Sequence, residues 1–220
     1  MRPLNKPASQ RRRGRPSLKQ PVKAREALLR SALKVFSEEG FKAASVRQIA
    51  SACSVDPALI KHHFGSKQEL WHEVVDYLAQ VSQTHREQQV SDLNDKQFNT
   101  RQSLEFIIGN FVRLTAEIPE MSMFIANEAT KGGERLHYLV EKLIKPFYLD
   151  FLPFIKTGIK EGELNAQDPK LFYFTLVNAV AMPLAFPGLL NQFSGPKVGT
   201  NEFNHALIET ILAIFIAKEQ

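Results

Sequence analysis

The sequence predicts an all-α protein, with an N-terminal helix-turn-helix domain of three helices followed by a C-terminal helical bundle. Apolar residues recur at spacings of three and four along most of the chain, as on the buried face of an amphipathic helix. Several of these segments begin at a capping Ser or Asp and end before Gly or Pro. The alternation of apolar and polar residues that is typical of strands is not found, so every element is expected to be helical.

The first helix is expected to begin near Arg25 and to end at Gly40. Glycine follows the last turn of many helices because it adopts a left-handed conformation without a steric penalty. The apolar face of this helix consists of Ala27, Leu28, Ala32, Leu33, Val35 and Phe36.

Two short helices and one long helix are expected to follow within about thirty residues. Serine with Gln or Glu three residues later forms a capping box, and Asp before Pro gives an N-cap and a residue suited to the first turn. The three starts are Ser45 with Gln48, Asp56 before Pro57, and Ser66 with Glu69.

Five further helices are expected after residue 95. Proline is accepted in a first turn but kinks or divides a helix when it lies inside one. Pro119 and Pro169 therefore favour helix starts, whereas Pro146, Pro153 and Pro183 predict kinks or breaks. The expected ranges are 100–117, 119–130, 134–160, 169–193 and 201–217, with Pro187 a further interruption in the fourth.

The segment from Leu171 to Pro196 has no charged residue, so a membrane-associated helix has to be considered. Its two internal prolines and its polar residues favour instead a helix buried in a core or between subunits. The last helix also has a wide apolar face. These two helices are expected to hold a homodimer together, and no membrane is expected as a partner.

The positive charge is concentrated at the N-terminus. The chain has a formal net charge of +5, yet residues 1–25 contain nine basic residues and no acid. Because residues 1–24 also have few large apolar side chains, they are expected to form a disordered basic arm. Such an arm favours a polyanionic partner, either nucleic acid or an anionic membrane surface.

Cysteine content favours a reducing compartment. Cys53 is the only cysteine of the chain and has no intramolecular partner for a disulfide. No signal-peptide pattern opens the sequence. We therefore expect a cytoplasmic protein, in which Cys53 is a small buried residue.

Residues 40–70, GFKAASVRQIASACSVDPALIKHHFGSKQEL, resemble the helix-turn-helix region of the TetR family of transcriptional regulators. The resemblance covers about a quarter of the chain and rests on Ser45, Ile49, Ala50, Val55, Ile60, His63, Phe64, Ser66, Lys67 and Leu70. It implies a dimeric regulator that binds a palindromic operator in double-stranded DNA through residues 25–77. Residues 78–220 would then bind an effector and dimerise. A repressor released by its ligand is the family's usual form, with activation left open.

The resemblance also implies roles for particular side chains. Arginine in the first turn of the second helix reaches a base edge in this family, and the exposed side of the third helix enters the major groove. Ser45 and Lys67, at helix N-termini, are expected to contact phosphates. The expected base-contacting residues are Arg47, Pro57, Ala58, Leu59, Lys61 and His62.

Two positions depart from the family pattern. Lys61 stands where the family usually has Tyr, so a cation replaces an aromatic contact. Ser54 stands at the usual turn Gly, where a left-handed conformation would cost about 1 kcal/mol.

In the arm, Arg12, Arg13 and Arg15 surround a Gly as in an AT-hook, which lies along the minor groove of AT-rich DNA. The alternative is a tail that adds only nonspecific affinity.

Other kinds of site are less well supported by the sequence. His62, His63 and His72 lack a zinc-binding spacing, so no metal and no cofactor are expected, and His63 is expected to pack in the core. No nucleophile elbow, glycine-rich phosphate loop or paired-carboxylate pattern indicates an enzyme. The competing hypothesis is a membrane-surface-associated helical protein that uses the basic arm on anionic lipid.

The effector itself cannot be read from the sequence. Effector pockets are mostly apolar with a few placed polar groups, and several polar residues interrupt the apolar helices after residue 100. The candidates for lining a pocket for an unknown small-molecule effector are Asn110, Asn127, Tyr148 and Asn178. For each of them, a surface position or an internal hydrogen bond is the alternative.

Overall fold

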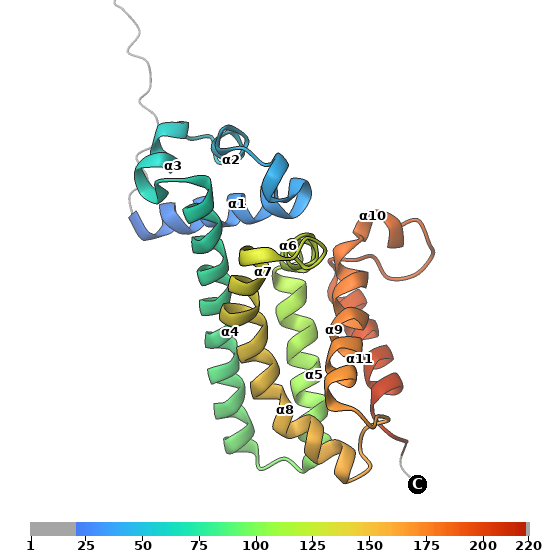
Figure 1. Cartoon of the computed structure of the whole chain (residues 1–220). Coiled ribbons are helices and arrows are strands. Elements are labelled where there is room, and N and C mark those ends of the chain that lie inside the picture. The colour runs from blue at the N-terminus through green and yellow to red at the C-terminus, as the bar shows by residue number, and fades with distance from the viewer. Residues whose placement is uncertain (1–20, 219–220) are drawn as a thin grey trace, which may run out of the picture.

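The computed structural model describes the backbone of residues 21–218 and the side chains of residues 25–218. Figure 1 shows an N-terminal head above an elongated helical bundle. The helices of the head and the long connecting helix are α1 (Pro21–Ala43), α2 (Val46–Ala52), α3 (Pro57–Phe64) and α4 (Lys67–Lys96). The bundle adds α5 (Thr100–Glu117), α6 (Glu120–Ala129), α7 (Gly133–Leu139), the π-helical segment η1 (Val140–Ile144), α8 (Lys145–Lys160), α9 (Pro169–Ala185), α10 (Pro187–Leu190) and α11 (Asn201–Phe215).

The all-α prediction is confirmed for the described residues, in which an isolated antiparallel bridge between Leu164 and Ile216 is the extent of β pairing. The apolar periodicity located α5 at its observed bounds and α6 within one residue at each end. Helix α1 begins earlier than expected, at Pro21, so residues 21–24 of the expected arm are helical. Residues 1–20, with Arg12, Arg13 and Arg15, lie outside the described part.

Gly40 interrupts α1 as the sequence predicted. Its φ of 71° and ψ of 164° lie outside the helical region, and the chain bends there before its last three residues. A residue with a Cβ would be strained at this φ, and its Cβ would lie 3.0 Å from Lys131 Nζ. Glycine therefore allows both the bend and the close approach of the loop after α6.

The prolines of the second half act in different ways. Pro146 follows the π-helical segment η1, whose wider turn accommodates a residue that has no N–H to donate. Pro153 and Pro183 remain inside α8 and α9, whereas Pro187 starts the separate helix α10. The expected helix 169–193 is thus divided. In the described part of the chain, no helix has the length and apolarity needed to cross a membrane.

Two hydrophobic cores stabilise the molecule. One joins α1–α3 and the first half of α4 to α6, α7 and η1, through side chains such as Trp71, Phe124 and Leu139. The other lies among α5, α8, α9 and α11. The expected boundary between residues 77 and 78 therefore falls inside α4 and inside the first core, because α6 and α7 pack on the head rather than on the lower bundle.

Specific polar contacts reinforce the joint between the head and α6 and α7. Asn127 Nδ2 donates to the carbonyl of Ser37 (2.9 Å), and Tyr138 Oη donates to Asp76 Oδ1 (2.8 Å). The rings of Trp71 and Phe124 stack with centroids 5.5 Å apart. The head and the adjoining part of the bundle are therefore connected by both apolar and hydrogen-bonded contacts.

Candidate nucleic-acid interface

Side-chain caps fix where each helix of the head begins. Ser45 Oγ accepts from the amide of Gln48 (3.2 Å), whose side-chain oxygen accepts from the amide of Ser45 (2.8 Å). The same reciprocal pair joins Ser66 and Glu69, and Asp56 Oδ1 caps α3 by accepting from the amide of Ala58 (2.8 Å). All three starts predicted from the sequence are confirmed.

The turn between α2 and α3 is tight and contains a left-handed residue. Ser54 has a φ of 55°, as its place at the family's glycine position predicted. Ile49, Ala50 and Ile60 are buried where the two helices pack. Ala52 and Ala58, which the sequence suggested as further small contacts, are exposed instead. Close packing at this junction therefore rests on Ala50 and two isoleucines.

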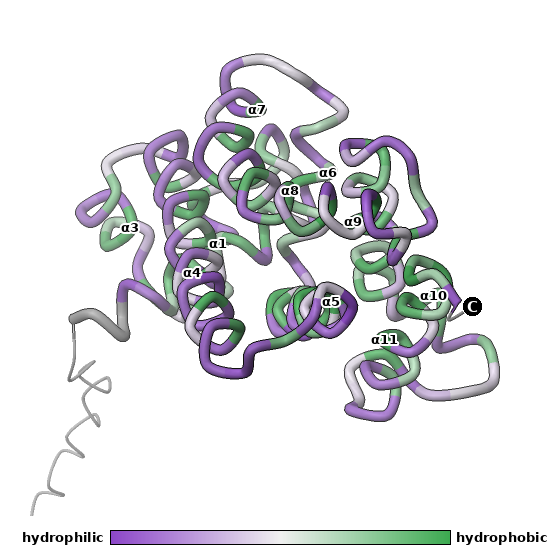
Figure 2. Tube along the Cα trace, turned by 90° about the horizontal axis from the view of Figure 1, so that it is seen from below, coloured by the Kyte–Doolittle hydropathy of each residue, from purple (hydrophilic) through white to green (hydrophobic). Residues whose placement is uncertain are grey.

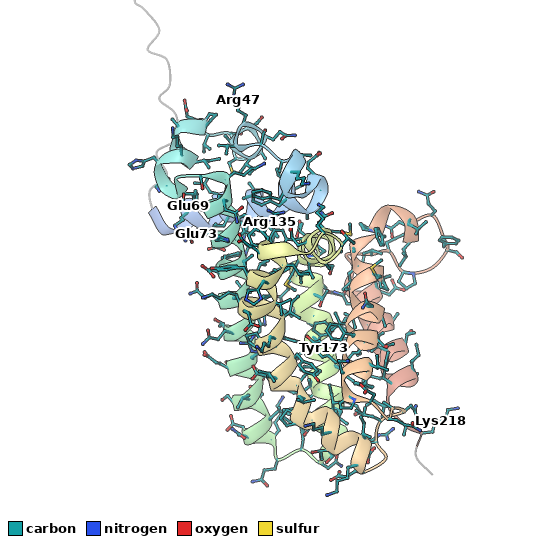
Figure 3. The ribbon with its side chains drawn as sticks, in the orientation of Figure 1. Arg47, Glu69, Glu73, Arg135, Tyr173 and Lys218 are labelled. Carbon is teal, nitrogen blue, oxygen red and sulfur yellow. The ribbon has the colours of Figure 1, made fainter. Side chains whose placement is uncertain are left out.

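The outer surface of α2 and α3 holds the candidate base-contacting residues. Arg47 lies at the tip of the head and points away from the bundle (Figure 3). The expected residues on α3 are also exposed, except Leu59, which is half-buried; those exposed are Pro57, Ala58, Lys61 and His62. The fold thus brings the six candidates onto one end of the molecule.

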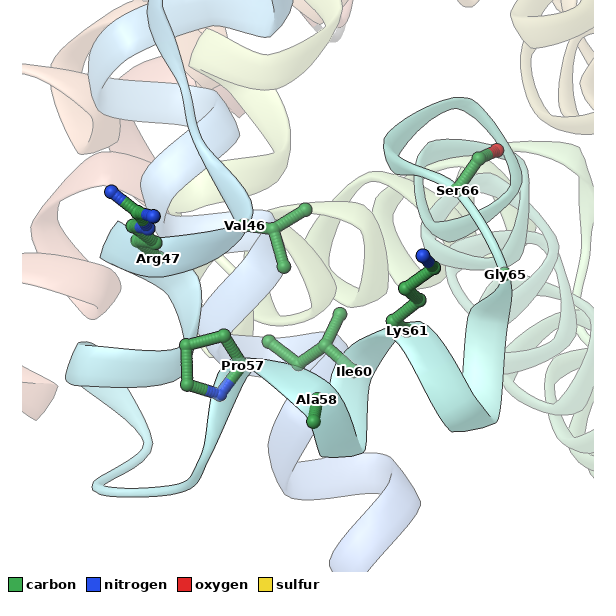
Figure 4. Close-up of a pocket in the computed structure, with 8 residues that line it drawn as sticks. All are labelled: Val46, Arg47, Pro57, Ala58, Ile60, Lys61, Gly65 and Ser66. Carbon is green, nitrogen blue, oxygen red and sulfur yellow. The ribbon is translucent and has the colours of Figure 1, made fainter.

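A shallow hollow of about 330 Å³ lies between α2, α3 and the start of α4. Figure 4 shows Arg47 and Lys61 on opposite sides of it, with Val46, Pro57 and Ile60 between them. Gly65 and Ser66 form its edge, where the amides of the first turn of α4 have no partner within the helix. Two cations and a helix N-terminus around an apolar floor provide suitable chemistry for a polyanion.

Lys67 has a structural role that was not expected. Its ammonium group lies half-buried against α1 and donates to the carbonyls of Phe41 (2.8 Å), Ala44 (2.8 Å) and Lys42 (3.4 Å). An ammonium group has three N–H donors, and these contacts use them. The Lys67 side chain thus ties the end of α1 to the start of α4, and a contact from Lys67 to phosphate stays a prediction.

Ser45 is occupied as a cap, since its hydroxyl also donates to Gln48 Oε1 (2.7 Å). A helix leaves its first amides without intrahelical partners, and here the Ser45 hydroxyl takes the third of them. The amides of Val46 and Arg47 remain for an external acceptor. A direct contact from Ser45 to phosphate stays a prediction.

The three histidines do not come together at one site: the rings of His62 and His63 contact each other with centroids 5.5 Å apart, and His72 lies on another helix. His62 and His63 are both exposed on α3, which corrects the expectation that His63 packs in the core. His72 lies half-buried on α4, where its ring contacts Tyr138 (centroids 4.4 Å apart) and Nε2 lies 3.0 Å from Gln68 Nε2. Within the described residues there is no group of three His, Cys, Asp or Glu placed to hold a metal ion.

A cluster that was not predicted from the sequence surrounds the ring of Phe41. Lys67 Nζ lies 4.6 Å from the centroid of this ring, and the guanidinium carbon of Arg135 lies 4.1 Å from it. Arg135 also pairs with Glu128 (3.0 Å), whose side chain is only 1% exposed. These residues are far apart in the sequence, so a local motif could not have revealed the cluster.

A cavity of about 480 Å³ lies in the upper part of the bundle, between α4, α5, α6, α7, η1, α8 and α9. Of the four candidate effector residues, Asn178 lines it. Asn127 binds the head instead, Asn110 accepts from Arg113 (2.7 Å), and Tyr148 contacts the ring of Tyr173 without reaching the cavity wall. Sequence reasoning missed three buried hydroxyl-bearing residues in this wall, Ser82, Thr115 and Tyr173, of which Thr115 donates to the carbonyl of Phe111 (2.8 Å).

The head and the bundle define the class: a helix-turn-helix protein with an all-α C-terminal domain that contains a cavity. Residues 28–74 match the model of the family described as bacterial regulatory proteins, tetR family. The N-terminal domain is therefore similar to that of the TetR family over these residues.

One curated relative is similar over a longer segment than the family model covers. The chain is 30% identical over 115 residues to the HTH-type transcriptional repressor NicS of Pseudomonas putida, a match that spans 52% of each protein. The chain thus spans about half the length of this curated relative.

Solved structures match over most of the chain and show the shared fold. HlyIIR, a hemolysin II transcriptional regulator, superimposes with a TM-score of 0.66 at 20% identity, covering 90% of this chain and 99% of that one. AibR in complex with isovaleryl coenzyme A and operator DNA gives a TM-score of 0.64 at 20% identity, covering 87% and 98%.

Proposed function

We propose that this protein is a dimeric, sequence-specific DNA-binding transcriptional regulator, a repressor whose operator binding is released by a small-molecule effector, and that it acts in the cytoplasm. The observation that carries the proposal is the surface of α2 and α3, where Arg47, Lys61 and His62 are exposed together at the end of the head. The match of residues 28–74 to the family supports it.

Arg47 is proposed to read a base edge, and Lys61 to contact a base or an adjacent phosphate. The arginine fork matches the acceptors of guanine, so it discriminates between bases, whereas a lysine beside a phosphate adds affinity for any sequence. The amides at the N-termini of α2 and α4 would hold phosphates beside the hollow.

Selection of an operator from random DNA with the full chain tests the proposal. Arg47→Ala should weaken binding to the selected operator about 10- to 100-fold and relax base preference at one position per half-site. Arg113→Ala removes an exposed arginine from α5 and serves as the matched control. An equal loss on operator and random DNA would exclude base reading by Arg47, and the absence of any selected sequence would contradict the function.

Dimerisation is proposed to use α9 and α11. Figure 2 shows hydrophobic segments in α10 and α11 on one side of the bundle. Large apolar side chains are exposed on α9, on α10 and the loop after it, and on α11: Leu171, Phe174, Met182, Leu189, Phe193 and Ile214. A two-fold dimer would cover such a face and fix the spacing of the two heads. Analytical ultracentrifugation of the wild type and of an Ile214→Glu variant tests this interface. We expect a dimer for the wild type and a monomer for the variant.

Helix α6 is proposed to transmit effector binding to the head. Phe124 on this helix belongs to the core of the head and Ala126 lines the cavity, while Met121 and Ile125 contact both. A ligand that displaces α6 would therefore also displace α1, through Asn127 and its contact with Ser37. By linkage, operator and effector would weaken each other's binding by the same factor.

The basic residues of the arm are proposed to extend the DNA contact. Neutralising each phosphate contributes about −0.9 to the slope of log affinity against log salt concentration. Deleting residues 1–20 should reduce that slope by several units, and an unchanged slope would mean that the arm does not contact DNA. No observation favours the membrane-surface alternative, and α9 ends at Ala185, short of the anchor that it would need.

A further inference from the structure

We infer that the cavity takes an uncharged, largely apolar ligand with a polar end that hydrogen-bonds to the hydroxyl groups of Ser82 and Tyr173. The inference rests on the proposed function only in treating this ligand as the effector, since binding can be measured without DNA. It excludes carboxylates, phosphates and coenzyme A thioesters as ligands held wholly within the cavity.

The first observation is the chemistry of the wall. The side chains that line the cavity include none of Asp, Glu, Lys, Arg or His. Most are apolar, among them Phe111, Leu114, Met121, Leu143 and Val177. A charged group moved from water to such surroundings loses its hydration and gains no opposite charge in return, which costs far more than the burial of a neutral group. The wall therefore selects against ions of either sign.

The second observation is a pair of buried hydroxyl groups without partners. Ser82 on α4 is 3% exposed and Tyr173 on α9 is 4% exposed, and both line the cavity. Within the described residues, no hydrogen bond is found for Ser82 Oγ or Tyr173 Oη, and neither oxygen is among the side-chain atoms fully closed off from solvent. Two hydroxyls that line an internal space and have no protein partner are available to a polar group that enters it.

The two hydroxyls line the cavity from α4 and α9, and the charged group nearest to them is Arg86. Arg86 lies one helical turn beyond Ser82 on the same face of α4, and its charge acts on Tyr173. Figure 3 shows Tyr173 among the helices of the bundle. Arg86 itself does not line the cavity, and its guanidinium is engaged with Asp150 at 2.6 Å. The polar end of the ligand would therefore meet two neutral hydroxyls rather than a free cation.

Tyr173 remains protonated in this setting. Burial raises the pKa of its phenol well above the usual range, against the opposing effect of Arg86. The neutral phenol can donate to a carbonyl or ether oxygen, and the Ser82 hydroxyl can either donate or accept. An ester, ketone, amide or alcohol would suit this pair of groups.

The mouth of the cavity supports a ligand that is mainly apolar. Phe174 and Met182 line the cavity and are exposed in the single chain, on the face that the proposed dimer would cover, while Asn178 donates its amide to the carbonyl of Phe174 (2.8 Å). The volume of about 480 Å³ lies within the range for sites that enclose small molecules. A medium-length acyl ester or a fused-ring compound would fill it.

Fluorescence of 1-aminoanthracene, which is neutral at pH 7, provides a direct assay on the full chain. Matched competitors that differ in charge, methyl decanoate and decanoate, test the selectivity. We expect methyl decanoate to displace the probe with at least tenfold higher affinity than decanoate. Decanoyl coenzyme A should not displace it. Equal or tighter binding of decanoate or of the thioester would overturn the inference, as would failure of both neutral compounds to bind.

Hydroxyl deletions locate the polar end of the ligand. Ser82→Ala and Tyr173→Phe should each weaken methyl decanoate about 3- to 10-fold, the loss expected for one hydrogen bond, and should leave 1-aminoanthracene bound. Tyr148→Phe is the matched control, because this ring contacts Tyr173 but does not line the cavity. Unchanged affinity in both hydroxyl variants would overturn the assigned contact.

Operator binding by the same preparations separates the two proposals. Binding of the neutral ligand without any effect on the operator would leave the ligand class standing and contradict its role as effector. Selective operator binding together with failure of the neutral compounds would contradict the ligand class and leave the DNA-binding function standing.

Discussion

The head, around residues 45–70, and the cavity wall, around residues 119–147, are built by different means. Each helix start in the head has a side-chain cap, and the turns contain Ser54 and Gly65 at positive φ. In the cavity wall, α6, α7 and η1 have no side-chain cap, and a π-helical segment precedes Pro146. Local hydrogen bonds define the first region, whereas packing against distant helices defines the second.

This difference fits what each region is proposed to do. A reading surface has to present Arg47 and Lys61 in a fixed relation to each other, which well-capped helices provide. A wall that yields to a ligand needs fewer local constraints and an internal space. The helix shared by both parts, α6, packs Phe124 into the head and turns Ile125 toward the cavity.

The largest expected loss of stability comes from replacing a phenylalanine of the head by alanine, compared with the same change at the cavity. Phe124 is 1% exposed and packs between Trp71 and Phe36, so Phe124→Ala should lower the free energy of unfolding by about 3–5 kcal/mol. Phe111 borders the cavity and already lacks neighbouring atoms on one side, so Phe111→Ala should cost less. Urea unfolding at one protein concentration measures both. Equal losses would mean that the cavity wall is packed as tightly as the head.

A smaller effect is expected from the caps. Ser66→Ala removes the acceptor for the amide of Glu69 (3.1 Å) and should cost about 1 kcal/mol of stability. Ser91→Ala is the matched control, because Ser91 is exposed in the interior of α4, where alanine is the better helix former. A loss in Ser91→Ala as large as in Ser66→Ala would contradict the importance of the cap.

The same contrast explains how far the sequence could predict the structure. Caps, periodicity and proline positions are local, so they located the starts of α2–α4 and the bounds of α5. The roles of Lys67 and Asn127 depend on α1, which is remote from both in sequence, and they were not predicted. Only one of four candidate residues, Asn178, lines the cavity, because a space between seven elements leaves no pattern along any one of them.

A left-handed residue ends α4 and offers a test at the boundary of the lower bundle. Gln97 has φ of 48° and ψ of 45°, a conformation that glycine adopts with less strain. Gln97→Gly should raise the free energy of unfolding by about 0.5–1 kcal/mol, while Gln97→Ala, which also removes the side chain, should not. Thermal unfolding distinguishes them, and equal behaviour of the two variants would show that the backbone conformation contributes nothing.

The smallest effect concerns the joint between head and bundle at high pH. Burial, with a smaller contribution from the hydrogen bond to Asp76, raises the pKa of Tyr138 from 10.0 to about 12. The folded state then holds this proton more tightly than the unfolded state, so the contribution to stability is complete below pH 10 and is lost as the pH rises towards 12. The group is partly exposed, so solvent screening keeps the effect small. Unfolding free energies of the wild type and of Tyr138→Phe should converge over that interval. A gap for Tyr138→Phe that does not change with pH would mean that Tyr138 contributes by packing on His72 and Trp71 and not through its proton.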